Sequence, residues 1–121
     1  MVKICIAGSR DWNNYEQLEE MMDKVLETYP INSIECIISG TAYGGDKLGE
    51  KWAKNHNIPI KQFPADWFKH GKKAGYLRNL EMADIADILV ICIKRKSKGS
   101  THMAKTMADT GKPVYLLQLD Y

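Results

Sequence analysis

The chain has 121 residues, the length of one domain, and its 45% hydrophobic and 26% charged residues are typical of a folded globular protein rather than a disordered or fibrous one. Its longest apolar run, residues 88–93, is far shorter than the roughly 20 residues that span a bilayer. The first residues lack the apolar stretch of a secretory signal. We therefore expect a single domain over residues 1–121, in the cytoplasm and without a membrane partner.

Cysteine and histidine usage bears on metal sites. Cys5, Cys36 and Cys92 each lie inside an apolar run, which is typical of small buried side chains in a reducing compartment. No pair of cysteines has the spacing of zinc ligands, and the histidines are scattered along the chain. We expect no metal site, and no cofactor is indicated.

Charge is distributed unevenly between the two halves of the chain. Residues 1–60 contain 6 Lys or Arg and 9 Asp or Glu, whereas residues 61–121 contain 11 and 6. The basic surplus falls in two short segments, residues 69–73 and 94–98. Such segments are either solvated loops or parts of an anion site, and their place in the fold decides between the two.

Apolar periodicity predicts strands and helices in strict alternation. The expected strands are Val2–Ala7, Ile34–Ser39, Ile58–Phe63, Ile88–Ile93 and Pro113–Leu119. The expected helices are Asn14–Thr28, Gly45–Asn55, Ala74–Ile85 and Thr101–Asp109. A polar, aromatic loop, residues 64–72, precedes the third helix.

The third expected strand alternates between apolar and polar residues, but runs such as Ile88–Ile93 are continuously apolar, which indicates strands buried on both faces of a parallel sheet. Five such strands with four main helices predict an α/β fold, a Rossmann-like three-layer sandwich whose five-stranded parallel sheet has the order 3-2-1-4-5. Ligands of such sheets bind beyond the carboxyl ends of the strands, where the strand order reverses. The expected site therefore lies between the first and fourth strands.

The loop after the first strand carries groups suited to an anion. Gly8 lets a ligand approach the backbone, Ser9 offers a hydroxyl, and Arg10 offers a guanidinium fork for a phosphate or carboxylate. Strand–glycine–helix turns are common in α/β proteins, so the loop by itself favours an anion site over a plain turn only modestly.

The loop after the second strand contains Gly40, Gly44 and Gly45 ahead of a helix. Glycines in this place let backbone N–H groups converge on an anion, although their spacing is neither that of a Walker A loop nor that of a dinucleotide fingerprint. Asp46, the next residue, is either the cap of the helix, a ligand for ribose hydroxyls, or a general base.

A second glycine-containing helix start follows the fourth strand. Gly99, Ser100 and Thr101 come directly after the basic segment 94–98 and form another candidate anion site. Since this segment lies beside the expected crevice, its position favours the anion site over solvated loop charge.

The segment of residues 64–79 is unusually long for a connection in a compact α/β unit, which favours a functional role. Trp67 and Phe68 either pack on the core as a lid or stack on a base. Arg78 and Asn79, one turn into the third helix, can point back to the same edge of the sheet.

Five motifs occur in a fixed order along the chain: Gly-Ser-Arg-Asp-Trp at 8–12, Ser-Gly then Gly-Gly-Asp within 39–46, Phe-Pro-Ala-Asp-Trp at 63–67, Gly-Tyr-Leu-Arg-Asn and Met within 75–82, and Lys-Gly-Ser-Thr at 98–101. In these motifs the chain resembles the small YspA-like, YpsA-related SLOG proteins of bacteria and their phages. The resemblance covers essentially the whole chain. It implies a Rossmann-like fold and the binding of nucleotides or nucleotide-derived ligands.

Within that superfamily the chain is also similar to the Lonely Guy type of phosphoribohydrolase, which cleaves the N-glycosidic bond of nucleoside 5′-monophosphates. The Arg-Lys-x-x-Met segment of those enzymes is similar to residues 78–82, and their Gly-x-Gly-Thr-x-x-Glu loop is similar to residues 98–101. At the position of the relatives' catalytic glutamate this chain has Ala104. Glycosidic cleavage here would have to use another carboxylate, for which Asp46 and Glu81 are the candidates.

Three functions follow from these observations. The first is binding of a nucleotide or nucleotide-derived small molecule, as a sensor or sequestering module, with Asp46 on ribose hydroxyls and Trp67 on the base. The second is a nucleoside 5′-monophosphate N-glycosidase or nucleotide hydrolase. The third is single-stranded nucleic-acid binding through the two basic segments, for which a net charge of +2 is modest. A homodimer or higher homo-oligomer is compatible with the resemblance, because relatives often dimerise through helices.

Overall fold

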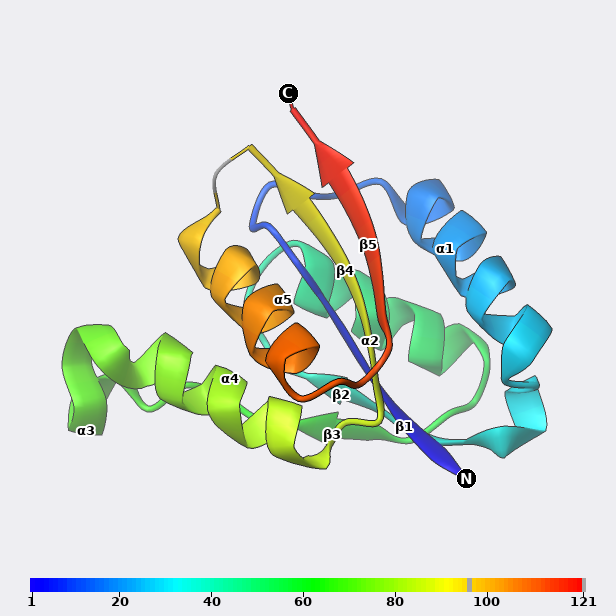
Figure 1. Ribbon diagram of the computed structural model, residues 1–121, viewed down its shortest axis with the longest axis horizontal. Helices are drawn as coiled ribbons and strands as arrows, with labels where there is room; N and C mark the ends of the chain where they lie inside the picture. Colours follow the sequence, from blue (N-terminus) through cyan, green and yellow to red (C-terminus); the bar gives the residue numbers. More distant parts are fainter. Residues whose placement is uncertain (96, 121) are drawn as a thin grey trace.

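The computed structural model describes residues 1–95 and 97–120. One parallel sheet has the strand order β3-β2-β1-β4-β5 (Figure 1). Its strands are β1 (Val2–Gly8), β2 (Ile34–Ser39), β3 (Ile60–Gln62), β4 (Ile88–Lys94) and β5 (Val114–Leu119). The predicted α/β fold and strand order are therefore confirmed.

Helices cover both faces of this sheet. The four main helices are α1 (Tyr15–Thr28), α2 (Gly45–Asn55), α4 (Ala74–Ile85) and α5 (Lys98–Asp109). Shorter elements are α3 (Trp67–His70) and the 3-10 turns Ile31–Ser33 and Gly71–Lys73. In the described part of the chain, every helix falls short of the length and apolar character needed to cross a bilayer.

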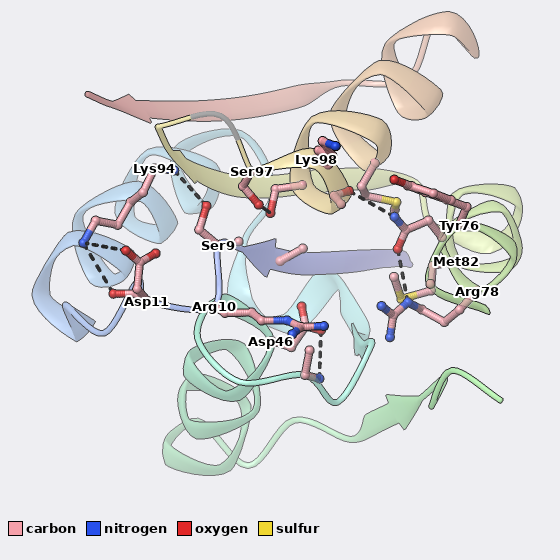
Figure 2. A pocket seen from close by; sticks show the side chains of 18 of the residues that line it. Ser9, Arg10, Asp11, Asp46, Tyr76, Arg78, Met82, Lys94, Ser97 and Lys98 are labelled. Atoms are coloured by element: carbon pink, nitrogen blue, oxygen red, sulfur yellow. Dashed lines mark hydrogen bonds and ion pairs between the residues drawn. The ribbon is translucent and has the colours of Figure 1, made fainter. Parts of the chain in front are cut away.

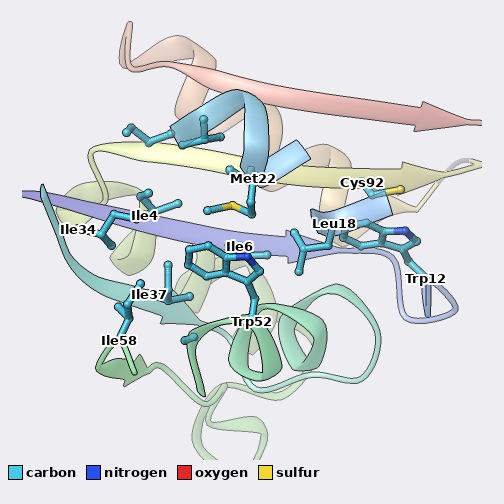
Figure 3. Close-up of a cluster of buried hydrophobic side chains, with 14 residues drawn as sticks. Ile4, Ile6, Trp12, Leu18, Met22, Ile34, Ile37, Trp52, Ile58 and Cys92 are labelled. Carbon is cyan, nitrogen blue, oxygen red and sulfur yellow. The ribbon is translucent and has the colours of Figure 1, made fainter. Parts of the chain in front are cut away.

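Alternate residues of β1 supply two separate cores. Ile4 and Ile6 pack with α1 and α2 on one face of the sheet (Figure 3), and Cys5 and Ala7 pack with α4 and α5 on the other. The helix residues of the first core include Leu18, Met22, Val25 and Trp52. Those of the second include Met82, Ala83, Met103 and Met107. Burial on both faces explains why the central strands β1, β2 and β4 are largely apolar in sequence.

Most boundaries agree with the sequence-based expectation to within one residue, and the larger differences lie at the third strand, at the start of the last helix and in the loop after the third strand. The third strand begins at Ile60 rather than Ile58, and Asn57, which directly precedes the predicted start, has a left-handed backbone (φ 55°). Helix α5 begins at Lys98, three residues before the predicted start. The expected loop at 64–72 contains α3, where the Asp66 side chain accepts a hydrogen bond from the Lys69 backbone N–H at 3.0 Å and so caps the helix.

Candidate functional site

A cavity of about 590 Å³ opens at the carboxyl ends of β1 and β4, where the strand order reverses (Figure 2). This is the position that the strand order predicts for a ligand. Its walls come from the loops after β1 and β4, the start of α2, one face of α4 and the start of α5. The volume lies within the range of roughly 300–1,000 Å³ that is typical of small-molecule sites.

The cavity brings together most of the residues that the sequence singled out. Those that line it are Gly8, Ser9, Arg10, Asp46, Trp67, Arg78, Asn79, Gly99 and Ser100. Gly40, Gly44 and Gly45 lie outside its lining, and Thr101 lines a neighbouring cavity instead. Glu81 is exposed on α4 and lines neither cavity.

Ser9 fixes the loop after β1 against β4. Its backbone N–H donates to the Cys92 carbonyl at 3.0 Å, and its Oγ accepts a hydrogen bond from the Lys94 backbone N–H at 2.8 Å. The Lys94 ammonium lies 3.7 Å from the Asp11 carboxylate, so its charge is paired at one end of the cavity. The loop therefore presents Arg10 from a rigid position.

Gly44 and Gly45 hold the start of α2 against the same loop. A Cβ on Gly45 would collide with the Gly8 backbone, and one on Gly44, whose φ is +81°, would collide with the Ser9 carbonyl. The Gly45 N–H points to the Ser9 carbonyl at 3.4 Å. These contacts give the two glycines a packing role behind the cavity wall.

Asp46 is a buried carboxylate on the cavity wall, with 6% of its surface exposed. The N-cap of α2 is Gly44, so Asp46 is not the cap; its Oδ2 instead accepts the Ala42 N–H at 3.1 Å. Burial raises the pKa of Asp46 to about 6, against the Ala42 hydrogen bond and the positive charge of Arg78, which lower it.

Arg78 reaches across the cavity from α4 to the loop after β2. Its Nη1 donates to the Gly40 carbonyl, and its Nε donates to Asn79 Oδ1 at 3.1 Å. A Cβ on Gly40 would lie 2.7 Å from both Arg78 Nη1 and Asp46 Oδ2. Gly40 therefore contributes to the site indirectly, by leaving room for a cation and a carboxylate on the same wall.

Asn79 connects this wall to the start of α5. Its Nδ2 donates to the Gly99 carbonyl at 3.1 Å and lies 3.2 Å from His102 Nδ1. With Oδ1 taken by Arg78, the buried amide is fixed in orientation. Asn79 therefore has a structural role, since it links α4 to the start of α5. Its direct contact with a ligand stays a prediction.

The start of α5 lines the cavity without a side-chain cap. Within the described residues, the N-cap Ser97 makes no capping hydrogen bond, and its hydroxyl instead donates to Ser100 Oγ at 3.2 Å. The first N–H groups of a helix have no partner within the helix and favour an anion. Lys96, in the middle of the basic segment, lies outside the described residues.

Trp67 and Phe68 stay outside the core. Trp67 is 52% exposed and lines the cavity, where its ring approaches Gly75, and Phe68 is fully exposed. The alternative in which both side chains pack on the core is therefore wrong.

Sequence reasoning missed the apolar floor of the cavity and a second buried acid. Met82 and Met103 are buried and line the cavity together with Tyr76. Glu50 is also buried; its Oε2 accepts from Ser39 Oγ at 2.6 Å. Its position four residues after Asp46, on the same face of α2, is the signal that could have identified it.

Hydrogen bonding decides the charge of Glu50. Burial raises its pKa, but the hydrogen bonds from Ser39 and Gln62 and the nearby Lys47 ammonium outweigh burial and leave the pKa below its ordinary value. Glu50 lies behind the cavity wall, and its negative charge raises the pKa of Asp46.

Comparisons with known proteins agree with this architecture. The family model described as "YspA, cpYpsA-related SLOG family" matches residues 2–70. The Gene 61 protein of Mycobacterium phage D29 is 31% identical over 120 residues, which are 94% of this chain and 94% of that protein.

A solved structure has a similar fold. It is DNA processing protein A from Helicobacter pylori, described for its single-stranded DNA binding mode, and it aligns with a TM-score of 0.67 and 22% identity. The match covers 95% of this chain, which spans 64% of the length of the solved chain. At this identity the likeness supports the fold alone.

Proposed function

The chain belongs to the YspA, cpYpsA-related SLOG family, and from this premise we propose that its cavity binds a nucleotide or a nucleotide-derived small molecule. The observation that carries the proposal is one cavity that combines cationic side chains, an uncapped helix start, a buried carboxylate and an apolar floor. A nucleotide offers a matching group to each: a phosphate, sugar hydroxyls and a planar base.

The phosphate would bind between the start of α5 and the cations around it. Arg10 and Arg78 supply guanidinium groups, and Lys98 stands at the first residue of the helix (Figure 2). Hydrogen bonds to charged groups contribute roughly 1.5–3 kcal/mol each, more than neutral ones. This region of the cavity therefore supplies most of the affinity.

The sugar and base would occupy the rest of the cavity. The Asp46 carboxylate can accept hydrogen bonds from ribose hydroxyls, and its burial makes such bonds strong. Trp67 presents an exposed ring at the opening, suited to stacking on a base, while Met82 and Met103 provide apolar contact.

Calorimetry with nucleoside mono-, di- and triphosphates tests the proposal. We expect at least one to bind, and Arg78→Ala to weaken that binding by roughly 1.5–3 kcal/mol, a factor of about 10 to 150. The matched control is Lys24→Ala, because Lys24 is an exposed cation on α1, away from the cavity. A parent protein that binds no member of a broad panel contradicts the proposal.

One observation favours a second candidate, an N-glycosidase of nucleoside monophosphates. Asp46 lies on the cavity wall with its pKa raised by burial to about 6, which suits a group that donates a proton near neutral pH. The other candidate acid, Glu81, is exposed on α4 outside the cavity lining. Release of free base from a nucleotide, lost in Asp46→Asn, would establish this activity, and an intact nucleotide after long incubation would exclude it.

A third candidate is single-stranded nucleic-acid binding. The Helicobacter pylori protein of similar fold is described as binding single-stranded DNA. In this chain α3 carries the exposed rings of Trp67 and Phe68 next to Lys69, and base stacking beside positive charge is how single strands are held without sequence preference. A gel shift that weakens steeply with salt would support it.

A further inference from the structure

A second cavity of about 510 Å³ lies beside the first. Its lining consists of Tyr76, Arg95, Lys98, Thr101 and His102, and the first three of these also line the first cavity. A ligand that fills the first cavity can therefore extend into the second along a wall that is cationic and aromatic throughout.

One hydrogen-bond donor of the second cavity, His102, is oriented by Asn79, which also binds Arg78. Because Asn79 Oδ1 accepts from Arg78, its Nδ2 faces His102 Nδ1 at 3.2 Å, and this ring nitrogen acts as the acceptor. Burial lowers the pKa of His102, which favours the neutral ring with its proton on Nε2. The ring stacks at a tilt on Tyr76, with 4.7 Å between centroids. His102 thus offers an N–H donor to the second cavity, and its orientation is set by Asn79 and Arg78, which line the first cavity.

Arg95, on the shared wall, is held in an unfavourable backbone conformation. Its φ is 58°, in the left-handed region that residues other than glycine rarely adopt. Strand β5 maintains this conformation: the Arg95 N–H donates to the Leu119 carbonyl at 2.7 Å, and the Arg95 carbonyl accepts from Gln118 Nε2 at 3.3 Å. Strain of this kind concentrates at binding sites, where the gain is the placement of a side chain.

We propose that the second cavity binds a second phosphate-bearing nucleoside of the same ligand, so that the protein recognises a two-nucleotide phosphodiester. This inference rests on the proposed function, because it places the first nucleotide in the first cavity. Lys98 and Arg95 stand where the linking phosphate would pass, and Tyr76 stands between the two cavities with 40% of its surface exposed for stacking.

The test compares a mononucleotide with the matching 5′-phosphorylated dinucleotide, for each of the four bases, by calorimetry. We expect the dinucleotide to bind about tenfold or more tightly than its mononucleotide, the scale of one added charge-assisted contact. Equal affinities overturn the inference and leave the proposed function standing. If neither ligand binds, the proposed function itself is wrong.

A pair of variants assigns the difference to the second cavity. Thr101 is exposed, and it lines the second cavity but not the first. Thr101→Glu adds a negative charge there, and we expect it to remove most of the dinucleotide advantage, whereas Thr101→Gln, of equal size and neutral, keeps it. Thermal unfolding of both variants confirms that the fold is intact. Equal dinucleotide advantages in the two variants overturn the inference.

A longer single strand of the same base identifies the source of the two-nucleotide unit. If it binds no more tightly than the dinucleotide, the natural ligand is a free small molecule. If it binds far more tightly, the unit is part of a strand.

Discussion

Helices α2 and α5 both follow a strand of the same sheet and have glycine at their start, Gly44 and Gly45 in α2 and Gly99 in α5, but the surroundings of these glycines are opposite. At α2, Gly44 and Gly45 press against the backbone of the loop after β1, and a side chain on either would collide with it. At α5, a Cβ on Gly99 would meet no described atom within 4 Å, and Gly99 lines the cavity. One helix start is packed into the fold and the other is open to a ligand.

This difference shows that a glycine at the start of a helix can have either of two physical roles. Glycine permits close approach of another backbone, and it equally leaves backbone N–H groups accessible to an anion. In the first case the N–H groups are engaged by the protein, as the Gly45 N–H is by Ser9. Only contacts made by distant segments decide between the two cases.

Alanine at the two positions should give the largest contrast. We expect Gly45→Ala to lower the free energy of unfolding by roughly 3 kcal/mol, because its methyl group would force the Gly8 backbone away. Gly99→Ala should leave stability unchanged or raise it by at most about 1 kcal/mol, since alanine favours a helix. Urea unfolding of both variants measures the difference, and similar stabilities would contradict the proposed division of roles.

The acid at the packed helix start should make stability depend on pH. Asp46 has a pKa of about 6 in the fold, raised from its ordinary 3.8, so between these values it is protonated when folded and ionised when unfolded. Unfolding then releases a proton, and stability falls as pH rises through this window, by about 2–3 kcal/mol. We expect Asp46→Asn, which keeps an acceptor for Ala42, to lose this dependence and to exceed the parent in stability above pH 6.

Glu50 provides the control for this measurement. Its pKa is lowered, so its contribution to stability is present above its ordinary pKa and is lost as pH falls through the lowered value. The two acids therefore act in opposite directions on one helix. The charge of Glu50 raises the pKa of Asp46. Glu50→Gln should therefore lower that pKa and narrow the pH range over which Asp46 makes stability fall. If stability still falls with rising pH over the same range in Asp46→Asn, another group causes the fall.

The sequence predicted the fold well because the central strands β1, β2 and β4 are largely buried on both faces. Runs such as Ile88–Ile93 have no polar alternation, and together with four periodic helices they indicate a parallel three-layer sheet. It could not predict α3, since four residues, Trp67–His70, carry no periodic signal. It also overestimated β3, which pairs with β2 through only Ile60, Lys61 and Gln62.

For the site, the sequence identified loops better than it identified roles. Strand order alone placed Ser9, Arg10 and Ser100 at one edge. The roles of Gly40 and Glu50 depend on side chains from other elements: Arg78 arrives from α4, and Ser39 from β2. Such contacts have no local signature in the chain.

Gly40 does not line the cavity, but it contacts Arg78 and Asp46, which do. A substitution at Gly40 therefore tests its indirect contribution to ligand binding. We expect Gly40→Ala to weaken nucleotide binding by about 1–2 kcal/mol with little effect on folding, because its Cβ displaces only the ends of Arg78 and Asp46. A double-mutant cycle with Arg78→Ala supplies the control. If Gly40→Ala acts by displacing Arg78, it should add little in the background that already lacks the guanidinium; full additivity would contradict this mechanism.

Ser97→Asp is expected to have the smallest effect of these variants. It is also the most direct test of whether the start of α5 binds a phosphate. A carboxylate at this N-cap can accept hydrogen bonds from the first N–H groups of α5 and interact with the helix dipole, so stability should rise by about 0.5–1 kcal/mol. The same groups would then be denied to a phosphate, and nucleotide affinity should fall by a similar amount. Ser97→Asn, a neutral cap, separates charge from hydrogen bonding. If affinity is unchanged in Ser97→Asp while α5 is stabilised, the phosphate binds elsewhere in the cavity, and the contrast between the two helix starts concerns packing alone.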